Sequence, residues 1–268
     1  MKIGPEVKAT TNISGSNPDT IVVRGHDLAG DLIGSVSFTD HVWLLVTGFL
    51  PSDAQRRILD STLVAIAEHG LVPSVVAARM TLAAGPEAFQ GAVAAGLLGC
   101  GSVILGSSQA AGEFLSAVVV KAADGDLADA AMTTISTYRA SGRAIPGYGH
   151  PLHKAGDPRA TRLFAIAREA GTYGLHCEAA HVAESLMPEL TKRNLAMNIS
   201  AAIPAVLLDA GYPLLALKGV PLLARTASLV AHLLEELTHP IGFHMAHAAS
   251  SAISYDGPAP EGFVPNEK

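Results

Sequence analysis

Signals for α-helices follow one another from Ser37 to the end of the chain, and only the β-branched stretch at 21–23 suggests a strand. The best specified helix begins at Ser52, because Ser52-Asp53-Ala54-Gln55 has the spacing of a capping box. Gly70 then ends the helical pattern. Its apolar residues recur at helical intervals: Ile58, Leu59, Leu63 and Ile66. The sequence therefore predicts an all-α fold.

Proline positions mark further helix starts. Pro73 and Pro86 each fit a first helical turn, and Asp157-Pro158 combines an N-cap residue with a proline at the first helical position. The helices expected after the first are 73–83, 86–100, 113–123, 126–141, 158–170, 176–191, 198–210, 220–237 and 241–254. No Pro/Gly/Ser-rich linker divides the chain, so we expect a second domain to be an inserted helical unit.

One run without charge, from Ala88 to Gly112, is long enough to span a bilayer. It also contains many glycines, with serine and glutamine among them, which favours close packing and a break over exposure to lipid. The first twenty residues are polar and show no secretory signal. We therefore expect no contact with a membrane.

Overall composition limits the partners. Hydrophobic residues make up 49% of the chain and charged residues 16%, which predicts much buried helical surface and a subunit interface. A net charge of −6 gives no electrostatic reason to expect nucleic acid. Cys100 and Cys177 are the two cysteines and show no paired spacing, which fits a reduced, cytoplasmic compartment.

Several common catalytic motifs are missing from the sequence: the dinucleotide GxGxxG fingerprint, the phosphate-binding P-loop, G-x-S-x-G and HExxH. His239, His244 and His247 lie on one late segment, but few carboxylates accompany them. A buried or interface cluster is the better interpretation, so we expect no metal.

The stretch 144–163 concentrates features that suit a ligand site. Pro146-Gly147-Tyr148-Gly149 lets the backbone approach a ligand closely, and His150 follows with an imidazole that can exchange protons. Lys154 and Arg159 add a point charge and a planar fork for anionic groups. A solvated loop with a capping histidine is the alternative, but the combination favours a site.

The same stretch resembles a known family. PGYGHPLHKAGDPRA is similar to the P-G-F/Y-G-H signature and following P-R pair of the citrate synthase superfamily. The segments VVRGHDLAGDLIGSVSFTDHVWLLVTGFLPS and EHGLVPSVVAARMTLAAG resemble further family motifs. The chain length is near that of the citryl-CoA lyase module at the C-terminus of ATP-citrate lyase and of its free-standing bacterial relatives.

This resemblance implies an architecture. The expected fold is all-α and citrate synthase-like, with a large domain formed by 1–106 and 212–268 and a smaller inserted domain at 107–211. It also implies an intertwined homodimer whose sites draw on both subunits, with a dimer of dimers as a further possibility.

Site roles follow from the resemblance, residue by residue. His150 matches the histidine that binds the carbonyl or hydroxyl of the substrate and acts in acid/base chemistry. Arg159 and His69 match residues of the carboxylate pocket. Gly147 and Gly149 match the turn against which coenzyme A lies, and Lys154 falls at a basic position near it. No tightly bound cofactor is implied, and a coenzyme A thioester is substrate or product.

Three positions depart from the family pattern. Leu105 stands where the synthases place a histidine, a change shared with the lyase modules. Ser200 aligns with the aspartate of the N-V-D motif, so a hydroxyl replaces the expected carboxylate. Loss of a general base typically lowers the rate of a reaction by roughly 10²- to 10⁴-fold. Glu236 lies near the place of the arginine in an R-A/S-x-G pattern, where its charge would repel a substrate carboxylate.

These observations predict a citryl-CoA lyase-like enzyme that cleaves a 3-hydroxyacyl-CoA by retro-aldol chemistry to acetyl-CoA and a keto acid such as oxaloacetate. In this hypothesis His150 takes the hydroxyl proton, Arg159 holds a carboxylate, and Ser200 or water returns a proton to the enolate. His153 and Asp157 are alternative proton carriers. The alternatives are a related acyl-CoA substrate, a non-catalytic thioester-binding homologue, a synthase-type condensation and, less well supported, a structural helical dimer.

Overall fold

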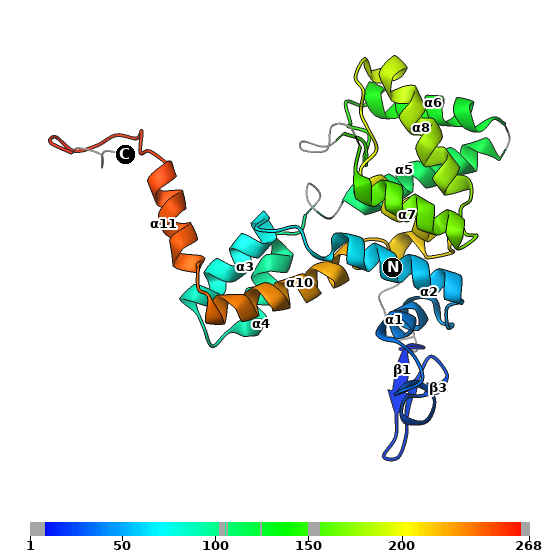
Figure 1. Ribbon diagram of the computed structural model, residues 1–268, viewed down its shortest axis with the longest axis horizontal. Coiled ribbons are helices and arrows are strands. Elements are labelled where there is room, and N and C mark those ends of the chain that lie inside the picture. The colour runs from blue at the N-terminus through cyan, green and yellow to red at the C-terminus, as the bar shows by residue number, and fades with distance from the viewer. Residues whose placement is uncertain (1–8, 102–104, 106, 124, 150–155, 264–268) are drawn as a thin grey trace. The chain divides into compact units, whose positions relative to one another are not determined.

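The computed structural model describes residues 9–101, 105, 107–123, 125–149 and 156–263 (Figure 1). Contacts divide the chain into two compact units, each built from two segments. Unit 1 comprises Met1–Thr62 and Ser107–Lys218, and unit 2 comprises Leu63–Gly106 and Gly219–Lys268. The fold is all-α and citrate synthase-like apart from three short strands. The domain boundaries expected from the resemblance stay a prediction.

Unit 1 begins with a small antiparallel sheet in the order β1-β2-β3, formed by Ser14–Ser16, Ile21–Val23 and His26–Asp27. Only the middle strand was expected from its β-branched residues; the outer two carry no such signal. A π-helical turn at Leu28–Leu32 follows, and then α1 (Phe38–Thr47). Ser37 and Asp40 form a reciprocal capping box that fixes the start of α1.

The predicted capping box of α2 (Asp53–Ala67) is confirmed. The Gln55 N–H donates to Ser52 Oγ at 3.3 Å, and the Ser52 N–H donates to Gln55 Oε1 at 2.9 Å. The Gln55 amide also donates to the Ala210 carbonyl at 2.9 Å, which joins the start of α2 to the end of α9. Gln55 therefore stabilises both the start of α2 and the packing of unit 1.

The rest of unit 1 is a group of helices around a buried one: α5 (Ser107–Ala122), α6 (Leu127–Ala140), α7 (Pro158–Glu169), α8 (Leu175–Thr191) and α9 (Ile199–Asp209). Helix α9 packs against α5, α7 and α8, and a short 3₁₀ turn (Leu214–Ala216) follows it. Nearly all side chains of α9 are buried, in keeping with its apolar sequence. Gly112 permits close approach, because a Cβ there would lie 2.4 Å from Leu217 Cδ1.

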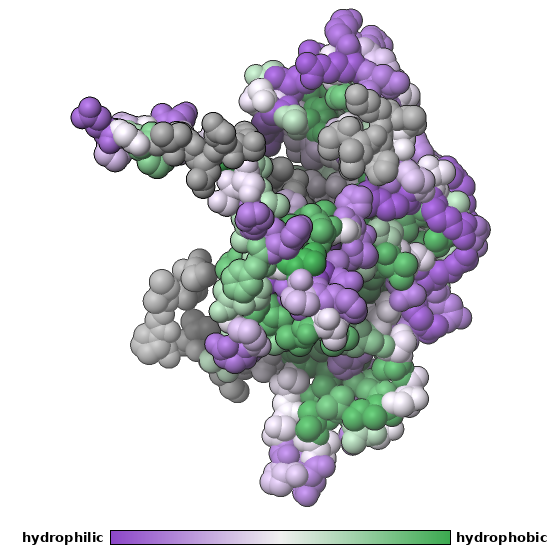
Figure 2. Space-filling model, turned by 60° about the vertical axis from the view of Figure 1, so that its left-hand side comes forward, coloured by the Kyte–Doolittle hydropathy of each residue, from purple (hydrophilic) through white to green (hydrophobic). Residues whose placement is uncertain are grey.

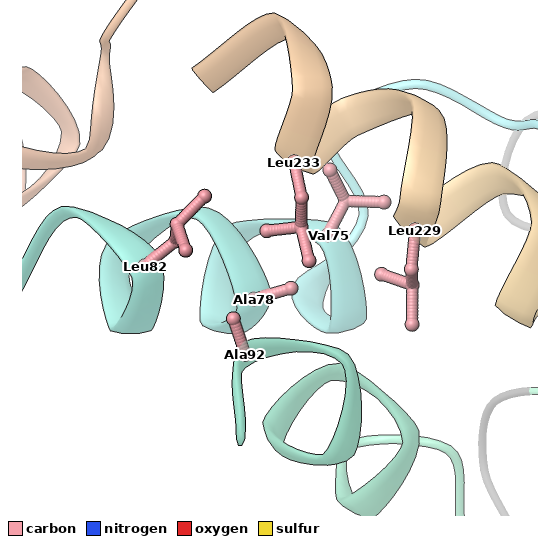
Figure 3. Close-up of a cluster of buried hydrophobic side chains, with 6 residues drawn as sticks. All are labelled: Val75, Ala78, Leu82, Ala92, Leu229 and Leu233. Carbon is pink, nitrogen blue, oxygen red and sulfur yellow. The ribbon is translucent and has the colours of Figure 1, made fainter. Parts of the chain in front are cut away.

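Unit 2 consists of α3 (Pro73–Ala84), α4 (Phe89–Leu98), α10 (Gly219–Thr238) and α11 (Gly242–Ala252). Helix α10 lies across α3 and α4, and apolar side chains fill the space between them (Figure 3). Gly96 allows this packing, because a Cβ there would lie 2.7 Å from Leu229 Cδ1. The buried cluster contains Val75, Ala78, Leu82, Ala92, Leu229 and Leu233.

Two expected helix starts are wrong. Helix α4 begins at Phe89 because Pro86 lies in a turn that follows Gly85, and α5 begins at Ser107, six residues before the expected start. The uncharged run 88–112 is shared between α4, which ends at Leu98, and α5, and so is not one long helix. The segment Leu214–Thr238 is long and apolar enough to cross a membrane. Its α10 part buries Arg225 and Glu236, which is typical of a core helix.

Candidate active site

The glycine turn at 147–149 is joined to the residues that lead into α9. The Gly149 N–H donates to the Ala196 carbonyl at 2.7 Å, and the Asn198 N–H donates to the Gly147 carbonyl at 2.9 Å. Both glycines have positive φ, 87° and 85°, which most other residues avoid. A Cβ on Gly147 would lie 2.5 Å from the Cβ of Ala201, so this turn requires glycine for space as well as for conformation.

Asn198 connects the turn to Ser200. As N-cap of α9, its Oδ1 accepts the Ser200 N–H at 2.9 Å, while its Nδ2 donates to the Gly149 carbonyl at 2.6 Å. The side chain of Asn198 therefore bonds both half-buried Ser200 and Gly149, the residue that precedes His150. The Ser200 hydroxyl also accepts a hydrogen bond from Ser107 Oγ at 2.8 Å, at the start of α5. Ser107 had not been singled out from the sequence, because nothing in its neighbourhood marks it.

Asp157 binds two parts of the site at once. Its fully buried carboxylate caps α7 and accepts hydrogen bonds from Arg159 Nε at 3.0 Å and Nη2 at 2.8 Å. It also accepts the Ile199 N–H at 3.1 Å, at the start of α9. Burial alone would raise the pKa of Asp157, but the hydrogen bonds and charge of Arg159 and the backbone N–H groups hold it below its ordinary value. Asp157 is thus an ionised tether between α7 and α9 rather than a free proton carrier.

Unit 1 therefore brings together four of the predicted site residues: Gly147, Gly149, Arg159 and Ser200. Asp157 occupies Nε and Nη2 of Arg159, and Nη1 has no acceptor among the residues that the structure describes, so it can reach a ligand. His150, His153 and Lys154 lie outside the described residues. His69 belongs to unit 2, where it is exposed directly after α2.

Glu236 does not have the role expected from the sequence. It is buried, and it accepts a hydrogen bond from Arg79 Nε at 2.7 Å and from the N–H groups of Ile241 and Gly242. Arg79 also binds Glu235 through Nη1 at 2.5 Å. Because Arg79 and two backbone N–H groups hold the Glu236 carboxylate inside unit 2, Glu236 does not present a free charge to a substrate pocket. Arg79 on α3 is itself buried, so this is an ion pair within unit 2.

Arg225 on α10 is a site candidate that sequence reasoning missed. Its residue is 2% exposed, yet Nε and Nη1 find no acceptor among the residues that the structure describes. A buried cation without a partner is costly, so the guanidinium is suited to an anionic ligand. A partial sequence signal exists, because Arg225-Thr226-Ala227-Ser228 matches the R-A/S-x-G family pattern at the arginine. The match was overlooked because Thr226 and Ser228 replace the second and fourth residues of the pattern.

No group of three metal-ligating side chains occurs within the described parts of the chain. This includes His239, His244 and His247 at the end of α10 and on α11.

Comparison with known proteins relates the chain to enzymes of coenzyme A thioesters. Its structure is similar to that of citryl-CoA lyase from Hydrogenobacter thermophilus, with a TM-score of 0.84 and 31% identity over 96% of this chain and 97% of that one. ATP citrate lyase from Methanothrix soehngenii, solved with citrate and coenzyme A, matches with a TM-score of 0.76 and 21% identity over 97% of this chain and 43% of that one. The second likeness concerns the fold alone.

Sequence comparison leads to the same group. A Mycobacterium tuberculosis protein with the provisional name citrate synthase 2 is 27% identical over 216 residues, which is 77% of this chain. The chain spans 56% of the length of that relative. The family model for the citrate synthase C-terminal domain matches residues 51–241, most of the chain and all the site residues described above. With that match and the near-complete overlap with a citryl-CoA lyase, this chain belongs to the citrate synthase family.

Proposed function

We propose that this protein cleaves a 3-hydroxyacyl-CoA such as citryl-CoA by a retro-aldol reaction, releasing acetyl-CoA and a keto acid such as oxaloacetate. The observation that carries the proposal is the junction in unit 1, where the glycine turn, Ser200 and the Asp157-bound Arg159 are tied together by hydrogen bonds. The 31% identity to a citryl-CoA lyase of nearly the same length supports it.

Each residue has a defined task in this reaction. His150 takes the proton of the substrate hydroxyl, the bond between the hydroxyl-bearing carbon and the thioester α-carbon breaks, and its electrons form the thioester enolate. Arg159 holds a carboxylate of the departing keto acid through Nη1. Arg225 gives unit 2 a buried cation for an anionic group. Gly147, Gly149 and Lys154 hold the coenzyme A portion, which enters as substrate and leaves as product.

The enolate carbon must then receive a proton. The Ser200 hydroxyl accepts from Ser107 and so keeps its own proton for a ligand, and either this hydroxyl or water completes the reaction. A hydroxyl is a weaker proton carrier at neutral pH than the carboxylate of the family motif. We therefore expect turnover well below that of a variant with a carboxylate at this position.

A second candidate function is a non-catalytic protein that binds a coenzyme A thioester or a carboxylate. The observation that favours it is the bond between the Ser107 and Ser200 hydroxyls, since neither group is a base near neutrality. This candidate predicts thioester binding without cleavage.

We also propose that the protein forms a homodimer in the cytoplasm. Hydrophobic side chains reach the surface of the molecule (Figure 2). On α10, Val230, Leu234 and Leu237 are exposed by 45%, 61% and 55%, at a spacing that places them on one helix face. Light scattering should give twice the mass of the chain, and a single-chain mass for the wild type would exclude the dimer.

The test of the function is incubation of the purified protein with citryl-CoA and detection of oxaloacetate and acetyl-CoA. His150→Ala should lose cleavage by roughly 10²- to 10⁴-fold. His153→Ala tests the alternative proton carrier, and His247→Ala is a matched control on the exposed surface of α11. Ser200→Asp should raise the rate.

Calorimetric titration with a non-cleavable citryl-CoA analogue separates the two candidates. If the wild type binds the analogue, and neither the wild type nor Ser200→Asp cleaves citryl-CoA, the protein is the non-catalytic thioester-binding protein. Failure of both binding and cleavage would exclude citryl-CoA and direct the search to other acyl-CoA thioesters.

A further inference from the structure

The turn that carries His69 is held closed by its neighbour Glu68. Directly after α2, Glu68 Oε1 accepts the N–H of Gly70 at 2.5 Å, across His69. Gly70 has φ of 69°, in the left-handed region that this turn needs. The backbone of His69 is therefore fixed on both sides, while the residue itself is exposed.

The second oxygen of the same carboxylate attaches this turn to α10. Glu68 Oε2 accepts from Ser228 Oγ at 2.5 Å and from His232 Nε2 at 3.0 Å. Because a carboxylate can only accept, both partners donate, which fixes the tautomer of His232. Ser228 is 6% exposed and stands where the R-A/S-x-G pattern has glycine, so this connection depends on a departure from the pattern.

Helix α10 is well packed around Ser228. Leu229 and Leu233 follow Ser228 and pack into the buried cluster with α3 and α4 (Figure 3). Arg225 lies three residues before Ser228, at the spacing of neighbours on one helix face. The turn of His69 is thus anchored one helical turn from the buried guanidinium of Arg225, whose Nε and Nη1 find no acceptor within the described parts of the chain.

We propose that Glu68 is a positioning residue that holds His69 beside Arg225, so that imidazole and guanidinium act on one anionic ligand. This inference rests on the proposed function, which makes that ligand the substrate. Glu68 is half exposed, so its hydrogen bonds contribute little to folding stability. Its effect should therefore appear in the reaction and not in unfolding.

The first test is a double-mutant cycle on citryl-CoA cleavage. Glu68→Ala should lower kcat/KM by about 10- to 100-fold, since small misplacements of a binding group have effects of this size. In a His69→Ala background the same change should cause no further loss, because Glu68 acts through His69. Glu87→Ala, at an exposed glutamate of the same unit, should leave kcat/KM unchanged.

The proposal would be overturned if the losses in kcat/KM of the two single variants multiply in the double variant, or if Glu68→Ala keeps full activity. Ser228→Ala removes one of the two bonds to α10 and should reproduce part of the effect, also without further loss in the His69→Ala background. It serves as the second variant if Glu68→Ala lowers the midpoint of thermal unfolding.

A measurement without substrate separates this proposal from the proposed function. The imidazole resonances of His69, assigned with His69→Gln, should be sharp in the wild-type protein and shifted or broadened in Glu68→Ala. Unchanged resonances would overturn the positioning role. Absence of citryl-CoA cleavage by the wild type would refute the proposed function, while the spectra would still decide the role of Glu68.

Discussion

The backbone N–H of Ile199 donates to the Asp157 carboxylate at 3.1 Å, so the first turn of α9 is bonded to the N-cap of α7. The same carboxylate grips Arg159 in a two-nitrogen fork. One buried acid therefore determines how Arg159, the proposed carboxylate-binding residue, and α9, which carries Ser200, lie relative to each other.

Removal of this charge should destabilise the protein in a pH-dependent way. Because the pKa of Asp157 is lowered in the folded state, its contribution is complete above the unfolded value of about 4 and disappears as the pH falls through the folded pKa. Asp157→Asn should cost about 2–3 kcal/mol at pH 7. The difference from the wild type should shrink below pH 4 in urea unfolding. Asp126→Asn, at the exposed N-cap of α6, should change stability little at either pH.

Replacement of Gly147 should be poorly tolerated for two reasons that a control can separate. Gly147→Ala meets both an unfavourable φ of 87° and a contact of 2.5 Å with Ala201. Gly142→Ala meets only the unfavourable φ, because the space around it is open. We expect a loss of about 1 kcal/mol at Gly142 and at least twice that at Gly147, measured by urea unfolding. Equal losses would show that the turn can move away from α9.

The Ser107 and Ser200 hydroxyls should be energetically coupled. Ser107→Ala and Ser200→Ala each remove the same hydrogen bond, so the double variant should be less destabilised than the sum of the single ones, by about 1 kcal/mol. Ser250→Ala, at an exposed serine on α11, should add independently to either change. Strict additivity at Ser107 and Ser200 would mean that the two hydroxyls do not interact in solution.

Arg79→Met should destabilise unit 2 strongly, because it leaves the buried carboxylate of Glu236 without its cation. The expected loss is about 3–5 kcal/mol, and adding Glu236→Gln should recover part of it. Arg57→Met breaks an exposed ion pair with Glu169 and should cost less than about 1 kcal/mol. Chemical unfolding of the four proteins provides the comparison.

Local signals predicted the helices well where caps and stop residues were explicit. Ser52 and Asp157 set the starts of α2 and α7 through bonds to residues two or three positions along, and those bonds are present in the structure. Helix α2 ends at Ala67, shortly before Gly70. The start of α5 was misplaced, because the bond made by its first residue, Ser107, goes to Ser200, far along the chain. Such a bond leaves no trace in local periodicity.

The site could be predicted only as far as its motifs were contiguous. Gly147, Gly149 and Arg159 share one short stretch and were proposed as site residues from it. The partner of Glu236 could not be predicted, because Arg79 lies on α3 and the ion pair depends on the packing of α3 with α10. The sequence around Arg225 matches the family pattern only at its first position, so Arg225 became evident through its burial, with Nε and Nη1 unbonded among the described residues.

The assembly of the core of unit 2 from two distant segments has a consequence for biosynthesis. Helices α3 and α4 leave the ribosome early, but the side chains that cover Val75, Ala78 and Ala92 come from α10, after all of the second segment of unit 1. During translation this apolar surface has no native cover, and exposed surface of that kind promotes aggregation. We therefore expect chains that stop before α10 to depend on chaperones, and the yield of the full-length protein to depend on how fast α10 is synthesised.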